Sequence, residues 1–149
     1  MNIQVNEPHI VHETIDGETI LMDLRSGNYF SIEKSGAVIW EILIQTANVD
    51  TLIQKAGELS NPGQSAQVRS DIQNFVEKLL SEDLIREAER NEAPEITEEM
   101  LNSLKRAVTA MEALEVNKYS DMQEMLLLDP IHDVDEKGWP EPKKNNDKE

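Results

Sequence analysis

Residues 18–44, ETILMDLRSGNYFSIEKSGAVIWEILI, change from the pattern of strands to the pattern of a helix. Residues 18–24 are apolar enough for a paired strand, and Ser26-Gly27-Asn28 is a turn signal after which Tyr29–Ile32 can form another short strand. Residues 37–44 are apolar on almost every side, which is typical of a helix buried at the centre of a core. This stretch therefore predicts a sheet followed directly by a central helix.

The residues before this stretch predict one more strand. HIVHETID, residues 9–16, begins an alternating run. Asp16-Gly17 follows, a favoured pair for a tight hairpin turn. We therefore expect a three-stranded antiparallel meander from His9 to Ile32.

The residues after it predict three helices. Ser35 is the expected N-cap of the first helix and Asn48 that of the second. Leu84 and Ile85 are expected to close the unit as a short extended end. The expected fold class is α+β, with three strands and three helices in a winged helix-turn-helix-like order. The third helix has the clearest apolar stripe, at helical spacing, formed by Val68, Ile72, Phe75, Val76, Leu79 and Leu80.

Charge and composition restrict the classes of function. The 149 residues include 30 acidic and 14 basic side chains, which gives a net charge of -16. Residues 1–90 and residues 91–149 each hold 15 acidic and 7 basic side chains. Such acidity opposes binding to nucleic acid and to anionic membranes. The absence of cysteine excludes disulfides and thiolate sites. We find no signal peptide, and the apolar runs are far shorter than the roughly 20 residues of a membrane span, so we expect a cytoplasmic protein.

Three motifs, in order, resemble the PqqD-like family, also called the RiPP recognition element, where RiPP denotes a ribosomally made, modified peptide. Ile20–Phe30 fits the pattern of a strand followed by D-x-x-x-G-x-Y-Y/F. Ser35–Leu43 fits G-x-x-I-W-x-x-L, and Phe75–Ile85 fits F-x-x-x-L-x-x-x-x-L-I/V. The resemblance covers residues 9–87 and leaves residues 91–149 unexplained. It predicts a PqqD-like peptide-recognition domain over residues 1–90.

The resemblance implies a non-catalytic protein without a cofactor. Such domains bind the leader segment of a precursor peptide and present it to a modifying enzyme. The leader would add as a strand to the exposed sheet edge, in the groove between the third strand and the third helix, a mode that relies on free backbone groups. The third strand contains no proline, which suits this role. The expected peptide-binding residues are Asn28, Tyr29, Phe30, Ser31 and Ile32 on the strand and Arg69, Ile72, Gln73, Val76 and Leu80 on the helix.

Two basic side chains of the third helix have alternative roles. Arg69 and Lys78 are expected to meet acidic groups of a leader peptide. The alternative is that they pair with the neighbouring Asp71, Glu77 or Glu82 on a solvated face, where such pairs contribute roughly 0–1 kcal/mol.

The aromatic residues are expected to divide between core and surface. Tyr29 and Phe30 point to opposite faces of a strand, so one belongs in the core and the other on the outer face or beside the groove. In the alternative, both serve the core and the tail covers the outer one. Trp40, on the most buried helix, is expected to be structural.

Residues 91–149 are expected to hold the end of a charged linker, an amphipathic helix over about 97–115, and an acidic, apolar tail. A short segment starts at Ser120, and the final ten residues are expected to be disordered. Residues 119–140 are expected to dock on the partner enzyme, or alternatively on the domain's own groove as an autoinhibitor or leader mimic, or to pack nonspecifically. The expected docking residues are Met122, Met125, Leu126, Leu127, Leu128, Ile131 and Trp139.

Other functions find less support. We find no catalytic motif, and His132 among acidic residues does not match a calcium-binding loop, so no metal is expected. A DNA-binding winged helix is a rival, but residues 64–83 carry two basic and four acidic side chains, which disfavours DNA. A second rival is an adaptor that binds two proteins and leaves the leader groove unused. Pairing of exposed edges also allows a homodimer.

Overall fold

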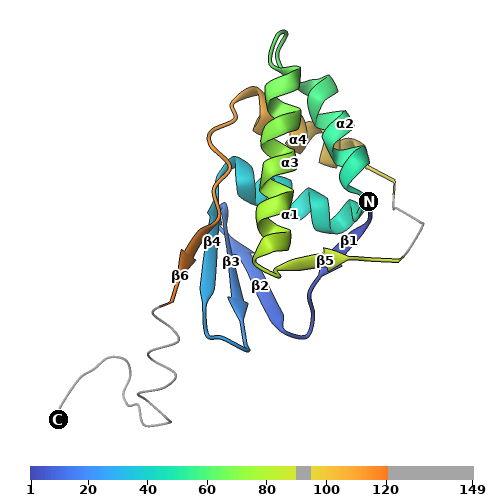
Figure 1. The fold of residues 1–149 in the computed structure, drawn as a ribbon. Helices are drawn as coiled ribbons and strands as arrows, with labels where there is room; N and C mark the ends of the chain where they lie inside the picture. The colour runs from blue at the N-terminus through green and yellow to red at the C-terminus, as the bar shows by residue number, and fades with distance from the viewer. Residues whose placement is uncertain (90–94, 121–149) are drawn as a thin grey trace, which may run out of the picture.

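The computed structural model describes residues 1–89 and 95–120, and the expected three-stranded meander forms most of its central sheet (Figure 1). Asp16 and Gly17 both have positive φ, which is the requirement of the tight hairpin turn that their sequence predicts. The strands pair in antiparallel register from Ile10 opposite Asp23 to Met22 opposite Tyr29. The strands are β2 (Ile10–Ile15), β3 (Glu18–Asp23) and β4 (Tyr29–Glu33).

The three predicted helices follow in the expected order. They are α1 (Ser35–Thr46), α2 (Val49–Leu59) and α3 (Ser65–Ser81). Figure 1 shows the helices gathered on one side of the sheet. Because side chains alternate along a strand, Leu21, Phe30 and Ile32 all point toward the helices and are buried there with Trp40 of α1. The structural role predicted for Trp40 is confirmed.

The helix caps match the prediction at one helix and not at another. The Oδ1 atom of Asn48 accepts a hydrogen bond from the backbone N–H of Thr51 at 2.9 Å, as an N-cap should. The prediction for Ser35 is wrong, because Ser35 is the first residue inside α1 and Lys34 takes the cap position without a side-chain bond. The Ser35 hydroxyl instead donates to the carbonyl oxygen of Ala107 at 3.3 Å.

Three short segments form strands that periodicity does not predict. β1 (Ile3–Val5) pairs with β5 (Ile85–Glu87) in a separate two-stranded sheet, and β5 contains part of the expected extended end. β6 (Asn117–Tyr119) joins the central sheet, whose order among the described residues is β2-β3-β4-β6. The central sheet therefore has four strands where three were expected, and the α+β class holds.

The helix predicted over 97–115 is shorter than expected. α4 (Glu98–Thr109) begins after Thr97, whose hydroxyl accepts from the N–H of Met100 at 3.1 Å. Leu104 and Val108 of α4 belong to the same buried cluster as the core of α1 and α2. The chain from residue 110 to 116 is not helical, and it connects α4 to β6 along the outside of the core.

The predicted segment starting at Ser120 continues into residues that the structure does not describe. The tail residues expected to dock on a partner, Met122, Met125, Leu126, Leu127, Leu128, Ile131 and Trp139, also lie outside the described residues. Within residues 1–89 and 95–120, no helix is both long and apolar enough to cross a membrane.

Candidate functional site

The outer edge of β4 is covered by a strand of the same chain. Tyr29 lies opposite Tyr119, Phe30 opposite Lys118 and Ser31 opposite Asn117 in antiparallel register. In Figure 1, β6 runs along the side of β4 that faces away from β3. This edge was expected to be free. The arrangement corresponds instead to the alternative in which the chain covers its own groove, although most of the pairing residues precede the predicted segment 119–140.

The two aromatic residues of β4 take opposite sides, as predicted. Phe30 is buried with only 2% of its surface exposed, whereas Tyr29 is half-buried on the outer face of the sheet. The ring of Tyr119 stacks on Tyr29 with the centroids 4.9 Å apart and an angle of 21° between the planes. The outer aromatic residue is thus covered by the C-terminal part of the chain.

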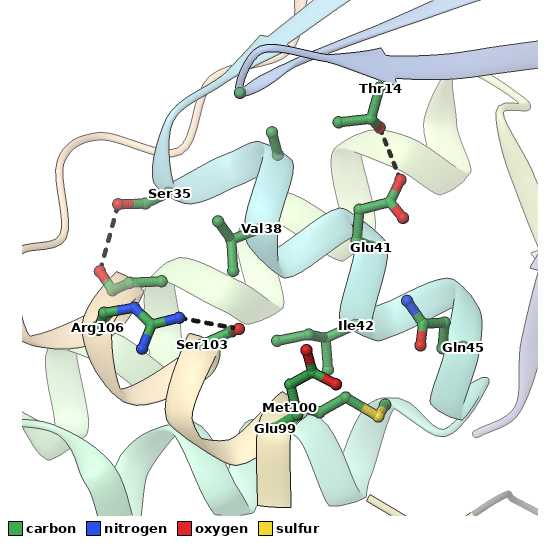
Figure 2. A pocket seen from close by; sticks show the side chains of 13 residues that line it. Thr14, Ser35, Val38, Glu41, Ile42, Gln45, Glu99, Met100, Ser103 and Arg106 are labelled. Carbon is green, nitrogen blue, oxygen red and sulfur yellow. Dashed lines mark hydrogen bonds between the residues drawn. The ribbon is translucent and has the colours of Figure 1, made fainter. Parts of the chain in front are cut away.

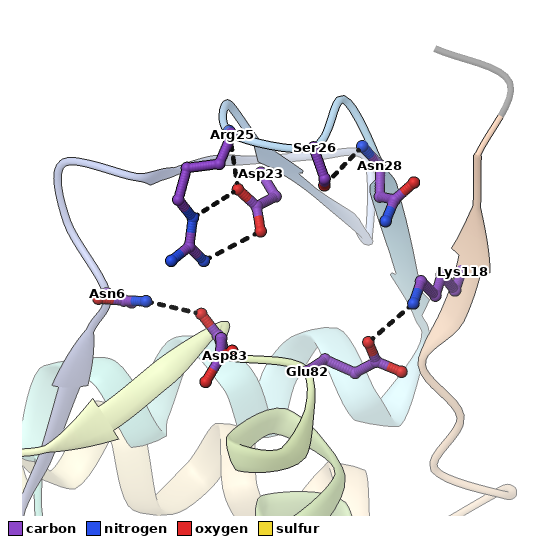
Figure 3. A network of polar contacts seen from close by, with 8 residues as sticks. All are labelled: Asn6, Asp23, Arg25, Ser26, Asn28, Glu82, Asp83 and Lys118. Carbon is purple, nitrogen blue, oxygen red and sulfur yellow. Dashed lines mark hydrogen bonds and ion pairs between the residues drawn. The ribbon is translucent and has the colours of Figure 1, made fainter. Parts of the chain in front are cut away.

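The inward-facing residue of β6 reaches the end of α3. The Lys118 ammonium lies 3.1 Å from Oε1 of Glu82 and 6.0 Å from the centroid of the Phe30 ring. Figure 3 marks the contact between Lys118 and Glu82. Lys78 lies 3.1 Å from the other oxygen of the same carboxylate. One carboxylate is therefore held between two cations, one from α3 and one from β6.

The electrostatics of Glu82 reflect these two partners. Partial burial acts to raise the pKa of Glu82, because it removes water from the charged form. The hydrogen bonds from Lys78 and Lys118 and their positive charges outweigh this effect, so the pKa lies below its usual value. The carboxylate therefore stays charged and ready to hold a cation.

The polar residues predicted on α3 make contacts away from β6. The Arg69 Nε atom donates to Ser65 Oγ at 3.1 Å, and its guanidinium lies against Gly57 of α2. Gln73 donates to Glu77 at 3.1 Å. Lys78 pairs with Glu82, which is the local ion pair of the alternative. None of these contacts reaches β6. The contact between the end of α3 and β6 is made by Glu82.

Several predicted peptide-binding residues are core residues in this structure. Ile32, Ile72 and Val76 have no exposed surface, because they pack between the sheet and the helices, and Leu80 is half-buried against the same cluster. A ligand therefore cannot touch the first three without a change in packing. Of the other predicted residues, Phe30 and Ser31 are also buried, Gln73 is exposed, and Asn28, Tyr29 and Arg69 are half-buried.

The turn that leads into β4 is fixed by ion pairing. Asp23 accepts two hydrogen bonds from the Arg25 guanidinium, each at 3.0 Å, and one from the Arg25 backbone N–H at 2.9 Å (Figure 3). Burial acts to raise the pKa of Asp23, but the bonds and charge of Arg25 lower it below its usual value. The turn ends at Asn28, whose Oδ1 atom is buried without a hydrogen-bond partner among the described residues.

A separate hollow of about 560 Å³ lies between α1, α4 and the β2–β3 turn (Figure 2). Thr14 Oγ1 donates to Glu41 Oε2 at 2.6 Å, and Arg106 donates to Ser103 Oγ at 3.3 Å. These charged groups are engaged by neighbouring hydroxyls. The hollow lies on a different part of the molecule from the covered edge of β4, and its walls join α4 to α1.

Comparison with known proteins agrees with the motifs. Residues 18–85 match the family described as coenzyme PQQ synthesis protein D (PqqD). The resemblance expected over residues 9–87 is thus confirmed over residues 18–85, which are similar to the PqqD family. One similar solved structure is TbiB1 in complex with the TbiA(beta) leader peptide, with 21% identity and a TM-score of 0.49. The alignment covers 58% of this chain and 99% of that one. Comparison with curated proteins found no match.

Proposed function

We propose that this protein binds the leader segment of a ribosomally made precursor peptide along the outer edge of β4 and presents it to a modifying enzyme. The observation that carries the proposal is the pairing of β4 with β6, because it demonstrates that this edge accepts an antiparallel strand. The PqqD-like domain of residues 18–85 supports the same role, since its family resemblance implies leader binding.

The strand that covers the edge is short enough to be replaced. β6 contains three residues, and both Lys118 and Tyr119 are exposed. Short, exposed elements with few buried contacts open at a low free-energy cost compared with unfolding of the core. A leader peptide that pairs with more of β4 would therefore displace β6. We infer that β6 acts as an internal competitor, which is the second role that this pairing favours.

The chemistry of modification is assigned to a separate enzyme. Residues 119–140 are the proposed docking segment for it, with Trp139 as the aromatic anchor among the apolar residues of the tail, because a few residues such as Trp commonly carry most of the binding energy at interfaces.

Calorimetric titration tests leader binding and displacement together. Leader peptides of precursors encoded near this gene are titrated into the full chain and into a full-length variant with Lys118→Glu and Tyr119→Ser. Displacement predicts that the variant binds a leader more tightly, because β6 no longer competes. Weaker binding to the variant would place the leader on β6 itself and refute displacement. No binding to either protein would refute the proposed function.

A further inference from the structure

We infer that the strand recognised at the β4 edge carries a basic residue directly followed by an aromatic residue, and that Glu82 is the residue that selects the basic one. The inference rests on the proposed function and deepens it, because it names the chemistry of the peptide. It comes from β6, the strand that occupies this edge among the described residues.

The register of β6 defines two positions of different character. The position opposite Phe30 faces the end of α3, and the position opposite Tyr29 faces outward. β6 fills the first with Lys118 and the second with Tyr119. Any antiparallel strand in this register places its side chains at the same two positions, so both impose a chemical preference.

The inward position favours a positive charge. Glu82 lies there with 18% of its side chain exposed, and the departure of β6 leaves it with Lys78 as its ion-pair partner among the described residues. The face of the Phe30 ring is also available to a cation, as its distance from Lys118 shows. An acidic residue at this position would meet the Glu82 carboxylate instead. The net charge of -16 favours the approach of a basic segment for the same reason.

This conclusion reverses the sign of the charge expected from the sequence. Arg69 and Lys78 were predicted to bind acidic groups of a leader. Arg69 lies against α2, and Lys78 is already paired with Glu82. The charged group that α3 directs toward the added strand is therefore a carboxylate.

The outward position favours a flat aromatic ring. Tyr29 presents its ring on the open face of the sheet, and Tyr119 stacks on it at 4.9 Å. Aromatic pairs of this kind contribute beyond the area that they bury. A small residue at this position would leave Tyr29 uncovered.

A peptide with the sequence EALEVNKYS, residues 112–120, is the probe. It is titrated into the full-length Lys118→Glu, Tyr119→Ser variant, in which the edge is released, and into that variant with Glu82→Gln added. Glu77→Gln is the matched control, because Glu77 is also an α3 carboxylate and bonds to Gln73 rather than to β6. Binding is followed by peptide fluorescence anisotropy and by NMR shifts of the β4 amides.

The expected result is a loss of roughly fivefold in affinity with Glu82→Gln, the size of a partly exposed ion pair, and no loss with Glu77→Gln. A peptide with Lys118→Glu should bind more weakly than the lysine peptide to the protein with Glu82, and this difference should disappear with Glu82→Gln. Equal binding of the lysine and glutamate peptides to the protein with Glu82 would overturn the inference.

Leader peptides separate this inference from the proposed function. Leaders that bind, but whose affinity is unchanged when the basic residue is replaced, would refute the inference and leave leader binding intact. Failure of the probe and of every leader to bind would refute both.

Discussion

We predict that β6 can detach from β4 without unfolding of the core. The perturbation is the double substitution Lys118→Ala and Tyr119→Ala. The stack of Tyr119 on Tyr29 accounts for about 0.5–1.5 kcal/mol. The partly exposed ion pair between Lys118 and Glu82 adds about 0.2–1 kcal/mol. Together they predict a loss of about 0.7–2.5 kcal/mol of docking free energy, or roughly a 3- to 70-fold larger open population.

Amide hydrogen exchange is the assay. The amides of residues 117–119 and those of β4 that bond to them should exchange faster by that factor, while amides of α1 keep their protection. Glu112→Ala is the matched control, because it breaks an exposed ion pair with Lys34 at 3.2 Å on the same connecting segment and leaves β6 intact. Unchanged exchange at residues 117–119 would refute the reasoning, and so would equal acceleration in α1, which would mean that β6 is part of the core.

Three further predictions concern groups around the same edge. The pKa of Glu82 is lower in the folded protein than in the unfolded chain. The contribution of Glu82 to docking is therefore complete above about pH 4.3, the ordinary pKa of Glu, and it is lost as the pH falls through the lower pKa of the folded state. Exchange at β6 measured against pH should show this loss, and Glu82→Gln should remove it. Gly36→Ala should destabilise the fold by about 1–3 kcal/mol in urea unfolding, because its Cβ would meet Ile32 Cγ2 at 2.7 Å; unchanged stability would show that Ile32 can move. Asp23→Asn should cost about 1–3 kcal/mol and loosen the turn before β4, since it removes the charge that Arg25 binds; NMR shifts confined to Arg25 would count against a role in the turn.

Local patterns were sufficient for much of the fold. The pair Asp16-Gly17 predicts its turn because few other residues accept positive φ at both positions. The stripe on α3 predicts its buried face because the period of 3.6 residues repeats for several turns. The predicted N-cap of α1 was wrong by one residue, because the backbone of Lys34 takes an unusual positive φ of 58° that no local sequence pattern predicts.

The strands that the sequence pattern does not predict are missed for a different physical reason. β1, β5 and β6 contain three residues each, which is too short for alternation to be distinguished from chance. Their partners lie far away in the chain, so their pairing is decided by the packed core and not by local preference. The candidate site also depends on contacts between residues that are distant in the sequence. Glu82 looks like one of many surface acids until β6 brings Lys118 to it.

The tether of β6 also determines what a competing leader must offer. A strand joined to its site by a short segment has an effective concentration of roughly millimolar. A free peptide at a lower concentration therefore cannot displace β6 if it pairs with the same three residues of β4. It must pair with more of the edge than β6 does. In antiparallel register, the position after the one that Tyr119 occupies falls opposite Asn28, where a buried Oδ1 atom has no partner among the described residues. Ser120 of this chain follows Tyr119 and does not bond to this atom, so a competing strand that places a donor there would remove the free-energy cost of an unpaired buried acceptor. Displacement of β6 should therefore require a strand that continues past the aromatic residue toward Asn28, and peptides that end at that residue should compete poorly.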